Sequence, residues 1–154
     1  MSNLYLLLKE RQQEQFNKFP MFFAFDKKQL EEGKQKLGVK DNKEICKFCS
    51  GGFIRKADKQ AFLNMILRQD TELKQAIAND KTGEGFIHDM FLYELANHEY
   101  CITYEIDDTL DAVNLTLDEV KSSKALKNGL ELAKKNYLES IIWKKGGKYE
   151  NRFY

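Results

Sequence analysis

The chain contains a single proline, Pro20, among 154 residues. Proline ends or kinks helices because its ring fixes φ and removes a backbone donor, so its absence elsewhere permits long helices along most of the chain. Residues 56–79 and 86–96 repeat apolar side chains at helical spacing, and both stretches are predicted to be helices. The second stretch is apolar on two adjoining faces, which predicts a central, buried helix.

Capping signals predict four further helices. The predicted cap and last residue of each helix are Ser2 and Phe16, Asp26 and Leu37, Asp108 and Val113, and Thr116 and Trp143. Gly38 is expected to close the second of these helices, because glycine readily takes the left-handed conformation after a helix end. Thr116 and Glu119 have the spacing of a capping box, which opens the last and longest helix.

Four short apolar runs are typical of strands. They are residues 21–25, 44–48, 52–54 and 101–106. The second and third runs meet across Ser50-Gly51-Gly52 and are interpreted either as two strands or as one zinc-knuckle-like turn. The expected fold class is α+β: a mostly helical single domain with a small antiparallel sheet, stapled by zinc if the cysteines bind metal. The domain is expected to span residues 1–145, and residues 146–154 to form a flexible or docked C-terminal tail.

Charge is unevenly distributed, although the formal net charge is only +1. Residues 84–119 contain ten acidic residues and no Lys or Arg, whereas residues 121–154 contain nine basic and three acidic residues. Uncompensated carboxylates repel nucleic acid and attract basic grooves on proteins. The residues expected to bind a protein partner are Glu105, Asp107, Asp108, Asp111, Asp118 and Glu119. For the earlier residues Glu84, Asp89 and Glu94, a solvated helix surface is a sufficient explanation.

The three cysteines and one of the two histidines form two pairs of the same spacing. Cys46 and Cys49 are three residues apart, and so are His98 and Cys101. Zinc takes four tetrahedral nitrogen and sulfur ligands, and a CxxC turn offers two thiolates to one ion. These four residues are therefore the predicted ligands of one structural zinc. The alternative is that the cysteines are small core residues. A redox pair is a weaker interpretation, because Ser-Gly-Gly rather than a helix follows Cys49.

The sequence lacks the common enzymatic motifs. It contains no nucleotide-binding glycine loop, no nucleophile elbow and no HExxH motif. Asp107, Asp108 and Asp111 could gather a divalent cation, since Asp107 and Asp111 share a helix face, but an acidic cap that complements the helix dipole is the favoured explanation. We therefore expect no enzymatic activity. No apolar run is long enough to cross a bilayer, and residues 4–8 lack the basic region of a secretory signal, so a cytoplasmic protein is expected.

Two segments carry a family resemblance: GGFIRKAD, residues 51–58, and DMFLYELANHEYCITYEIDDTLDAVNLT, residues 89–116. From about Phe19 to Leu138, the chain resembles a family of small, mostly uncharacterised proteins from phages and mobile elements of low-GC bacteria. In type rather than in motif, it is also similar to phage-encoded anti-CRISPR inhibitors of RNA-guided nucleases. That second resemblance implies a non-enzymatic protein that binds a large nuclease in a basic, nucleic-acid-binding region.

The expected function is inhibition of a host defence nuclease, of the CRISPR-associated RNA-guided class, through the acidic residues and with a structural zinc. The partner is then a protein in the cytoplasm of the host bacterial cell, and no membrane is involved. The alternative is a zinc-containing nucleic-acid-binding accessory module that uses the basic C-terminal helix and tail. Its cations would be Lys121, Lys124, Lys127, Lys134, Lys135, Lys144, Lys145, Lys148 and Arg152, with Trp143, Tyr149 and Phe153 as stacking groups.

Overall fold

The computed structural model describes residues 2–149, and the side chains of residues 2–142. The chain divides into two compact units: unit 1 combines residues 1–10 with residues 73–154, and unit 2 comprises residues 11–72. Two helices contribute residues to both units, α1 (Leu4–Lys18) and α3 (Lys59–Asn79). The expectation of one domain ending at residue 145 stays a prediction, and residues 150–154 of the expected tail lie outside the described residues.

Unit 2 contains the sheet, whose three antiparallel strands have the order β1-β3-β2. Its elements between α1 and α3 are β1 (Phe22–Phe23), α2 (Lys27–Lys36), the 3₁₀ turn Asn42–Glu44, β2 (Ile45–Phe48), β3 (Gly52–Arg55) and the 3₁₀ turn Lys56–Asp58. Of the two interpretations of residues 44–54, the paired strands are confirmed: Cys46 lies opposite Ile54, and Phe48 opposite Gly52. Cys49 and Gly51 turn the chain between these strands with φ of 39° and 84°.

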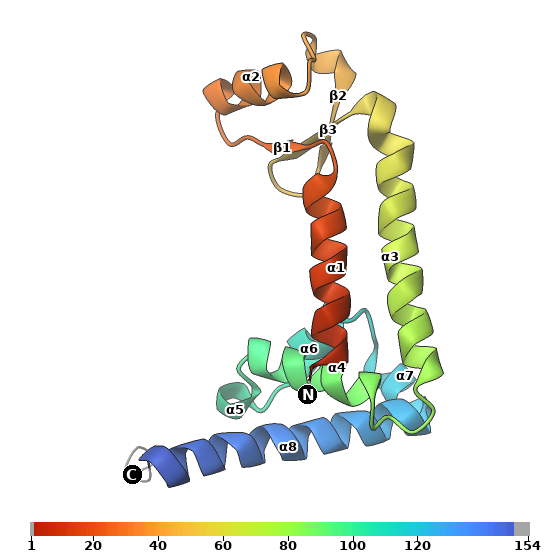
Figure 1. The fold of residues 1–154 in the computed structure, drawn as a ribbon, viewed down its shortest axis with the longest axis vertical. Coiled ribbons are helices and arrows are strands. Elements are labelled where there is room, and N and C mark those ends of the chain that lie inside the picture. Colours follow the sequence, from red (N-terminus) through yellow and green to blue (C-terminus); the bar gives the residue numbers. More distant parts are fainter. Residues whose placement is uncertain (1, 150–154) are drawn as a thin grey trace. The chain divides into compact units, whose positions relative to one another are not determined.

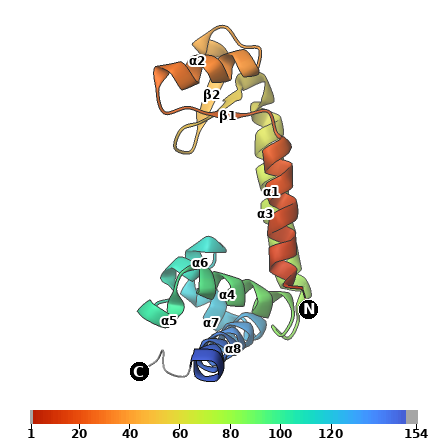
Figure 2. The ribbon, with the colours of Figure 1, turned by 60° about the vertical axis from the view of Figure 1, so that its left-hand side comes forward.

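Helix α2 lies beside the strands, and its ends follow the predicted signals (Figure 2). The Asp26 carboxylate accepts a hydrogen bond from the Gln29 N–H at 2.7 Å, and Gly38 follows the helix with φ of 71°. The ring of Phe22 rests against Gly33, where a Cβ atom would overlap it. Phe22 is buried with Ala24, Val39 and Ile45, so this cluster fixes α2 on the sheet.

The second half of α1 packs beside the first half of α3 within unit 2. Phe16 contacts Phe62, with ring centroids 6.2 Å apart, and Gln12 and Gln69 exchange side-chain-to-backbone hydrogen bonds of 3.0 and 3.1 Å. Phe62 belongs to a buried cluster with Ile54 of β3. This cluster joins the helix pair to the sheet.

Unit 1 is helical throughout its regular elements. They are α4 (Phe86–Asn97), α5 (Tyr100–Thr103), α6 (Asp107–Ala112), α7 (Leu117–Ser122) and α8 (Lys124–Tyr149). Helix α4 lies along α8 (Figure 1). Ile87, Met90 and Phe91 of α4 are completely buried, which confirms that the stretch 86–96 is a central helix. The mostly helical α+β class with a small antiparallel sheet is therefore confirmed.

Five local predictions are wrong. Of residues 21–25, only Phe22 and Phe23 form a strand, and Ile106 rather than Asp108 occupies the N-cap position of α6. Residues 101–106 are not a strand, because left-handed residues at Glu99 (φ 53°) and Tyr104 (φ 59°) flank the single helical turn α5. The helix opened by Thr116 breaks at Ser123, whose extended backbone ends α7, and α8 then continues past residue 143 to Tyr149. Helix α1 is capped by Asn3 rather than Ser2, since the Asn3 side chain accepts the Leu6 N–H at 2.9 Å.

Among the described residues, no helix has both the length and the hydropathy needed to traverse a bilayer.

Candidate functional site

The six predicted partner-binding carboxylates, here called the acidic surface, lie in a short stretch of unit 1. Asp107, Asp108 and Asp111 are on α6, Asp118 and Glu119 are on α7, and Glu105 precedes α6. All six residues are exposed, as the sequence predicted. In the described part of the chain, none of them forms an ion pair with a basic residue. Their charge is therefore not neutralised locally.

The backbone under the acidic surface is anchored in the core of unit 1. Thr109 and Leu110 are the buried residues of α6, and the Thr109 hydroxyl donates to the Glu94 carbonyl oxygen of α4 at 3.4 Å. Helix α7 begins with the predicted capping box, in which Thr116 and Glu119 bond each other's backbone N–H groups at 3.2 and 3.3 Å. Anchored helices hold exposed carboxylates in a fixed arrangement, which a flexible loop would not.

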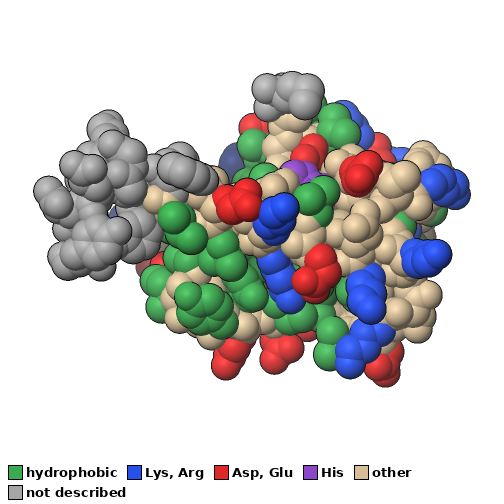
Figure 3. All heavy atoms as spheres, turned by 90° about the horizontal axis from the view of Figure 1, so that it is seen from below, with side chains coloured by type: hydrophobic (Ala, Val, Ile, Leu, Met, Phe, Trp, Pro, Cys, Tyr) green, Lys and Arg blue, Asp and Glu red, His purple; other side chains and the backbone are tan. Residues whose placement is uncertain are grey.

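Two exposed apolar side chains precede the acidic surface in the sequence. Ile102 is 70% exposed and Tyr104 is 68% exposed, although the predicted strand would have placed both on one half-buried face. Tyr104 contacts the buried Tyr100 edge to face, with ring centroids 5.8 Å apart. On the face drawn in Figure 3, hydrophobic side chains gather, with both acidic and basic side chains around them. The sequence did not predict the exposure of Ile102 and Tyr104, because alternation of apolar residues suggested a strand.

Glu94 is not on a solvated surface, which corrects the prediction for this residue. It is 1% exposed, and its Oε1 atom and the His98 Nε2 atom have no hydrogen-bond partner among the described residues. Lys9 Nζ lies 3.8 Å from Oε1, and His98 Nε2 lies 3.5 Å from Oε2. Burial and the neighbouring Glu94 carboxylate raise the pKa of Tyr5 above its ordinary value. This polar cluster joins the start of α1 to α4 and is structural.

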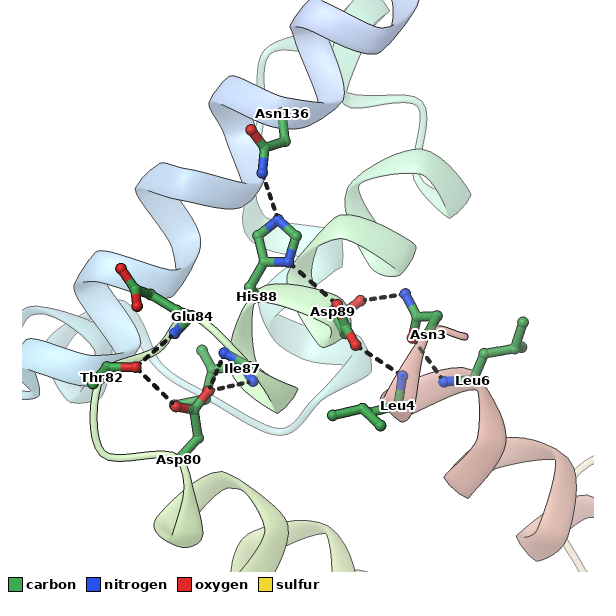
Figure 4. A network of polar contacts seen from close by, with 11 residues as sticks. Asn3, Leu4, Leu6, Asp80, Thr82, Glu84, Ile87, His88, Asp89 and Asn136 are labelled. Carbon is green, nitrogen blue, oxygen red and sulfur yellow. Dashed lines mark hydrogen bonds and ion pairs between the residues drawn. The ribbon is translucent and has the colours of Figure 1, made fainter. Parts of the chain in front are cut away.

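Asp89, also predicted to be solvated, is half-buried in a second polar network (Figure 4). Its carboxylate accepts the Leu4 N–H of α1 at 2.8 Å and lies 3.2 Å from His88 Nδ1. The Asn136 amide nitrogen of α8 lies 2.8 Å from His88 Nε2, so Nε2 accepts and Nδ1 carries the proton. His88 thereby connects α1, α4 and α8, and its ring nitrogens are occupied by structural contacts.

The loop before α4 is organised by Asp80 (Figure 4). Its carboxylate accepts backbone N–H groups from Gly83, Gly85 and Ile87 at 2.9 to 3.0 Å. Partial burial opposes ionisation of Asp80, but these hydrogen bonds outweigh it and hold its pKa below the ordinary value. The backbone N–H groups at the start of α4 therefore already donate to a carboxylate of the chain itself.

The predicted zinc ligands belong to different units. In unit 2, Cys46 of β2 is half-buried against the cluster of Ile54, and Cys49 is exposed in the following turn. His98 and Cys101 belong to unit 1. All three cysteines are free thiols.

His98 and Cys101 have separate local partners. His98 faces Glu94, whereas Cys101 lies near Tyr137 of α8, and burial, followed by the Cys101 thiol, raises the pKa of Tyr137 to about 12. Among the residues with described side chains, no group of three or more His, Cys, Asp or Glu residues is arranged to hold a metal ion. The zinc site therefore stays a prediction, and so does the divalent-cation site at Asp107 and Asp111.

Comparison with known proteins gives one match. DUF7659, a family of unknown function, matches residues 4–136. No curated protein and no solved structure matches the chain. Because the match covers most of its length, the chain belongs to DUF7659.

Proposed function

We propose that this member of a family of unknown function is a non-enzymatic binding protein whose acidic surface docks on a basic, nucleic-acid-binding region of a partner protein. The partner class suggested by the sequence resemblance is a host defence nuclease of the RNA-guided CRISPR type, which the protein would inhibit in the bacterial cytoplasm. The supporting observation is six exposed carboxylates without an ion-pair partner in the described part of the chain, within 36 residues that contain no Lys or Arg.

Electrostatics supports a protein partner of opposite charge. Charges of one sign on anchored helices steer a complementary surface and raise association rates by about 10- to 1,000-fold at low ionic strength. Carboxylates alone contribute little lasting affinity, because desolvation offsets much of the attraction. The neighbouring Ile102 and Tyr104 supply exposed apolar area of the kind that carries binding energy at interface centres. In this proposal the carboxylates set the association rate and the apolar pair slows dissociation.

The test is inhibition of guide-dependent DNA cleavage by wild-type protein and by the double variant Asp107→Lys/Asp111→Lys. Both side chains are exposed, but Asp107 lies in the first turn of α6, where the helix dipole favours a carboxylate, so we expect the unfolding free energy to fall by about 1 kcal/mol and the variant to remain folded. Association with the nuclease should become about tenfold slower at low salt, and the difference should shrink as salt rises.

A matched control is available on α1. Glu10 and Glu14 are also four residues apart on a helix, are exposed, and form no ion pair with a described residue. Glu10→Lys/Glu14→Lys makes the same change in net charge and should leave inhibition unaltered. Full inhibition by the folded Asp107/Asp111 variant would remove the acidic surface from the proposal. If wild-type protein inhibits no member of a panel of such nucleases, the nuclease assignment fails.

The alternative function, nucleic-acid binding by the basic C-terminal segment, has less support. Lys121, Lys124, Lys127 and Lys135 are exposed, but Lys134 lies 3.5 Å from Glu131 as an ion pair. The predicted stacking groups Trp143, Tyr149 and Phe153 lie outside the described side chains. Salt-dependent binding of an oligonucleotide that is lost on changing these lysines would favour this function over docking on a protein.

A further inference from the structure

Unit 2 presents an aromatic ring that is both exposed and held in place. Phe25, which follows β1, is 74% exposed. Its backbone N–H donates to the Gln29 side chain at 2.7 Å. The edge of its ring rests on the turn after β2, where a Cβ atom at Gly51 would lie 2.8 Å from Phe25 Cζ. Gly51 also has a left-handed φ of 84°, which side chains rarely adopt. Both the backbone conformation and the contact with Phe25 therefore require glycine at this position.

The ring borders a hollow of about 370 Å³ whose charged lining is mainly basic. Lys27 and Lys47 line this hollow, both are exposed, and neither forms an ion pair with a described residue. The one acidic lining residue is Asp26, whose carboxylate is already engaged as the cap of α2. Leu30 and Phe53 provide apolar lining. The hollow therefore combines an exposed aromatic ring with two available ammonium groups.

The net charge of unit 2 also favours a negatively charged ligand. Residues 11–72 contain thirteen Lys and Arg residues and nine Asp and Glu residues, whereas the acidic surface belongs entirely to unit 1. A ligand complementary to Phe25, Lys27 and Lys47 must offer a flat aromatic group together with negative charge. Bases of single-stranded nucleic acid meet this requirement, since an unpaired base stacks on an exposed ring while the adjoining phosphates bind lysines. Bases inside a duplex are already stacked and cannot reach such a ring.

We propose that the hollow beside Phe25 binds single-stranded nucleic acid, with one base stacked on Phe25 and the flanking phosphates bound by Lys27 and Lys47. The contact is independent of the acidic surface and of the basic C-terminal segment. Sequence selectivity is not expected, because every base has an aromatic face and no base-edge recognition is required.

The test measures binding of fluorescein-labelled dT20 and rU20 to the full chain by fluorescence anisotropy. Two phosphate contacts predict a salt slope of about −1.4, or about sevenfold weaker binding at 200 mM than at 50 mM salt. Phe25→Ala should weaken binding by about five- to 150-fold, and Phe25→Trp should retain it. Lys27→Glu/Lys47→Glu should weaken binding and flatten the salt dependence.

Controls separate this contact from unspecific attraction. Phe23→Ala removes another exposed ring of unit 2 that does not line this hollow, and Lys40→Glu reverses an exposed charge of unit 2 outside it, so both should bind like wild type. Circular dichroism and melting curves check that each variant is folded. The proposal is overturned if neither oligonucleotide binds at 50 mM salt. It is equally overturned if Phe25→Ala and Lys27→Glu/Lys47→Glu bind both oligonucleotides like wild type.

Discussion

Asp80 shows how one carboxylate can hold a loop in unit 1. A charged acceptor strengthens each hydrogen bond, and three backbone N–H groups converge on Asp80 within 3.0 Å. An amide in its place keeps the shape but loses the charge and replaces one accepting oxygen by an NH2 group, which cannot accept from a backbone N–H. Asp80→Asn should therefore destabilise the protein by about 1–3 kcal/mol at pH 7, measured by urea unfolding. Asp111→Asn makes the same chemical change at an exposed position and should have almost no effect.

The same variant predicts a pH dependence with a defined sign. The folded pKa of Asp80 lies below the ordinary value of 3.8, so folding favours the ionised form. Its stabilising contribution is complete above the unfolded pKa and is lost as pH falls through the folded pKa. The difference between wild type and Asp80→Asn should therefore be constant from pH 7 to about pH 5 and shrink below about pH 4. A difference that stays constant down to pH 2 would contradict this account of Asp80.

At the scale of elements, the contact between α8 and the start of α4 depends on Gly129. A Cβ atom there would overlap the Ile87 side chain and lie 2.8 Å from the Gly83 carbonyl oxygen. Gly→Ala inside an exposed helix normally stabilises by about 1 kcal/mol. At Gly129 the sign should reverse, with a loss of about 1–3 kcal/mol from overpacking. Thermal unfolding of Gly129→Ala beside Ser140→Ala, an exposed site on the same helix, measures this. Stabilisation by Gly129→Ala would show that α8 can shift without cost.

Elements with a strong local signal could be predicted from the sequence. The Asp26 cap, the Gly38 stop and the Thr116 capping box are all present, because each acts within a few residues of itself. The strand predicted over residues 101–106 is absent, because alternation of apolar residues gave no sign of the left-handed backbone at Glu99 and Tyr104. The prediction of one unbroken helix from Thr116 missed the break at Ser123, although a local signal is present: the Ser123 hydroxyl accepts the Leu126 N–H at 3.2 Å and caps the start of α8.

The candidate site was predictable only in part, for a related reason. Exposure of the acidic surface followed from charge alone, because unpaired carboxylates are rarely buried. Glu94 has the same chemistry but is buried beside Lys9, which lies 85 positions earlier in the chain. Residues 21–25 were likewise predicted to form a strand, but only Phe22 and Phe23 pair with β3, which leaves the ring of Phe25 exposed. Contacts between residues far apart in the chain determine whether these side chains are buried or exposed, and a single sequence does not reveal such contacts.

At the scale of the whole molecule, the remaining prediction concerns metal. If Cys46, Cys49, His98 and Cys101 bind one structural zinc, purified protein should contain about one ion per chain. A structural site binds metal only when folded, so a strong chelator should lower the melting temperature, and added zinc should restore it. The competing account is that Cys46 packs against the cluster of Ile54, and Cys101 against the core that contains Tyr137, without any metal.

Two variants separate these accounts. Cys49 is exposed, so Cys49→Ser should change stability by less than about 0.5 kcal/mol if the thiol has no ligand. With zinc bound, the same change should remove most of the metal and lower the melting temperature as far as the chelator does. His98 belongs to unit 1 and Cys49 to unit 2. If both bind the same zinc, His98→Gln should lower the metal content as much as Cys49→Ser does. If purified wild-type protein contains no metal and the chelator does not change its melting temperature, the zinc prediction is wrong and the cysteines are local packing residues.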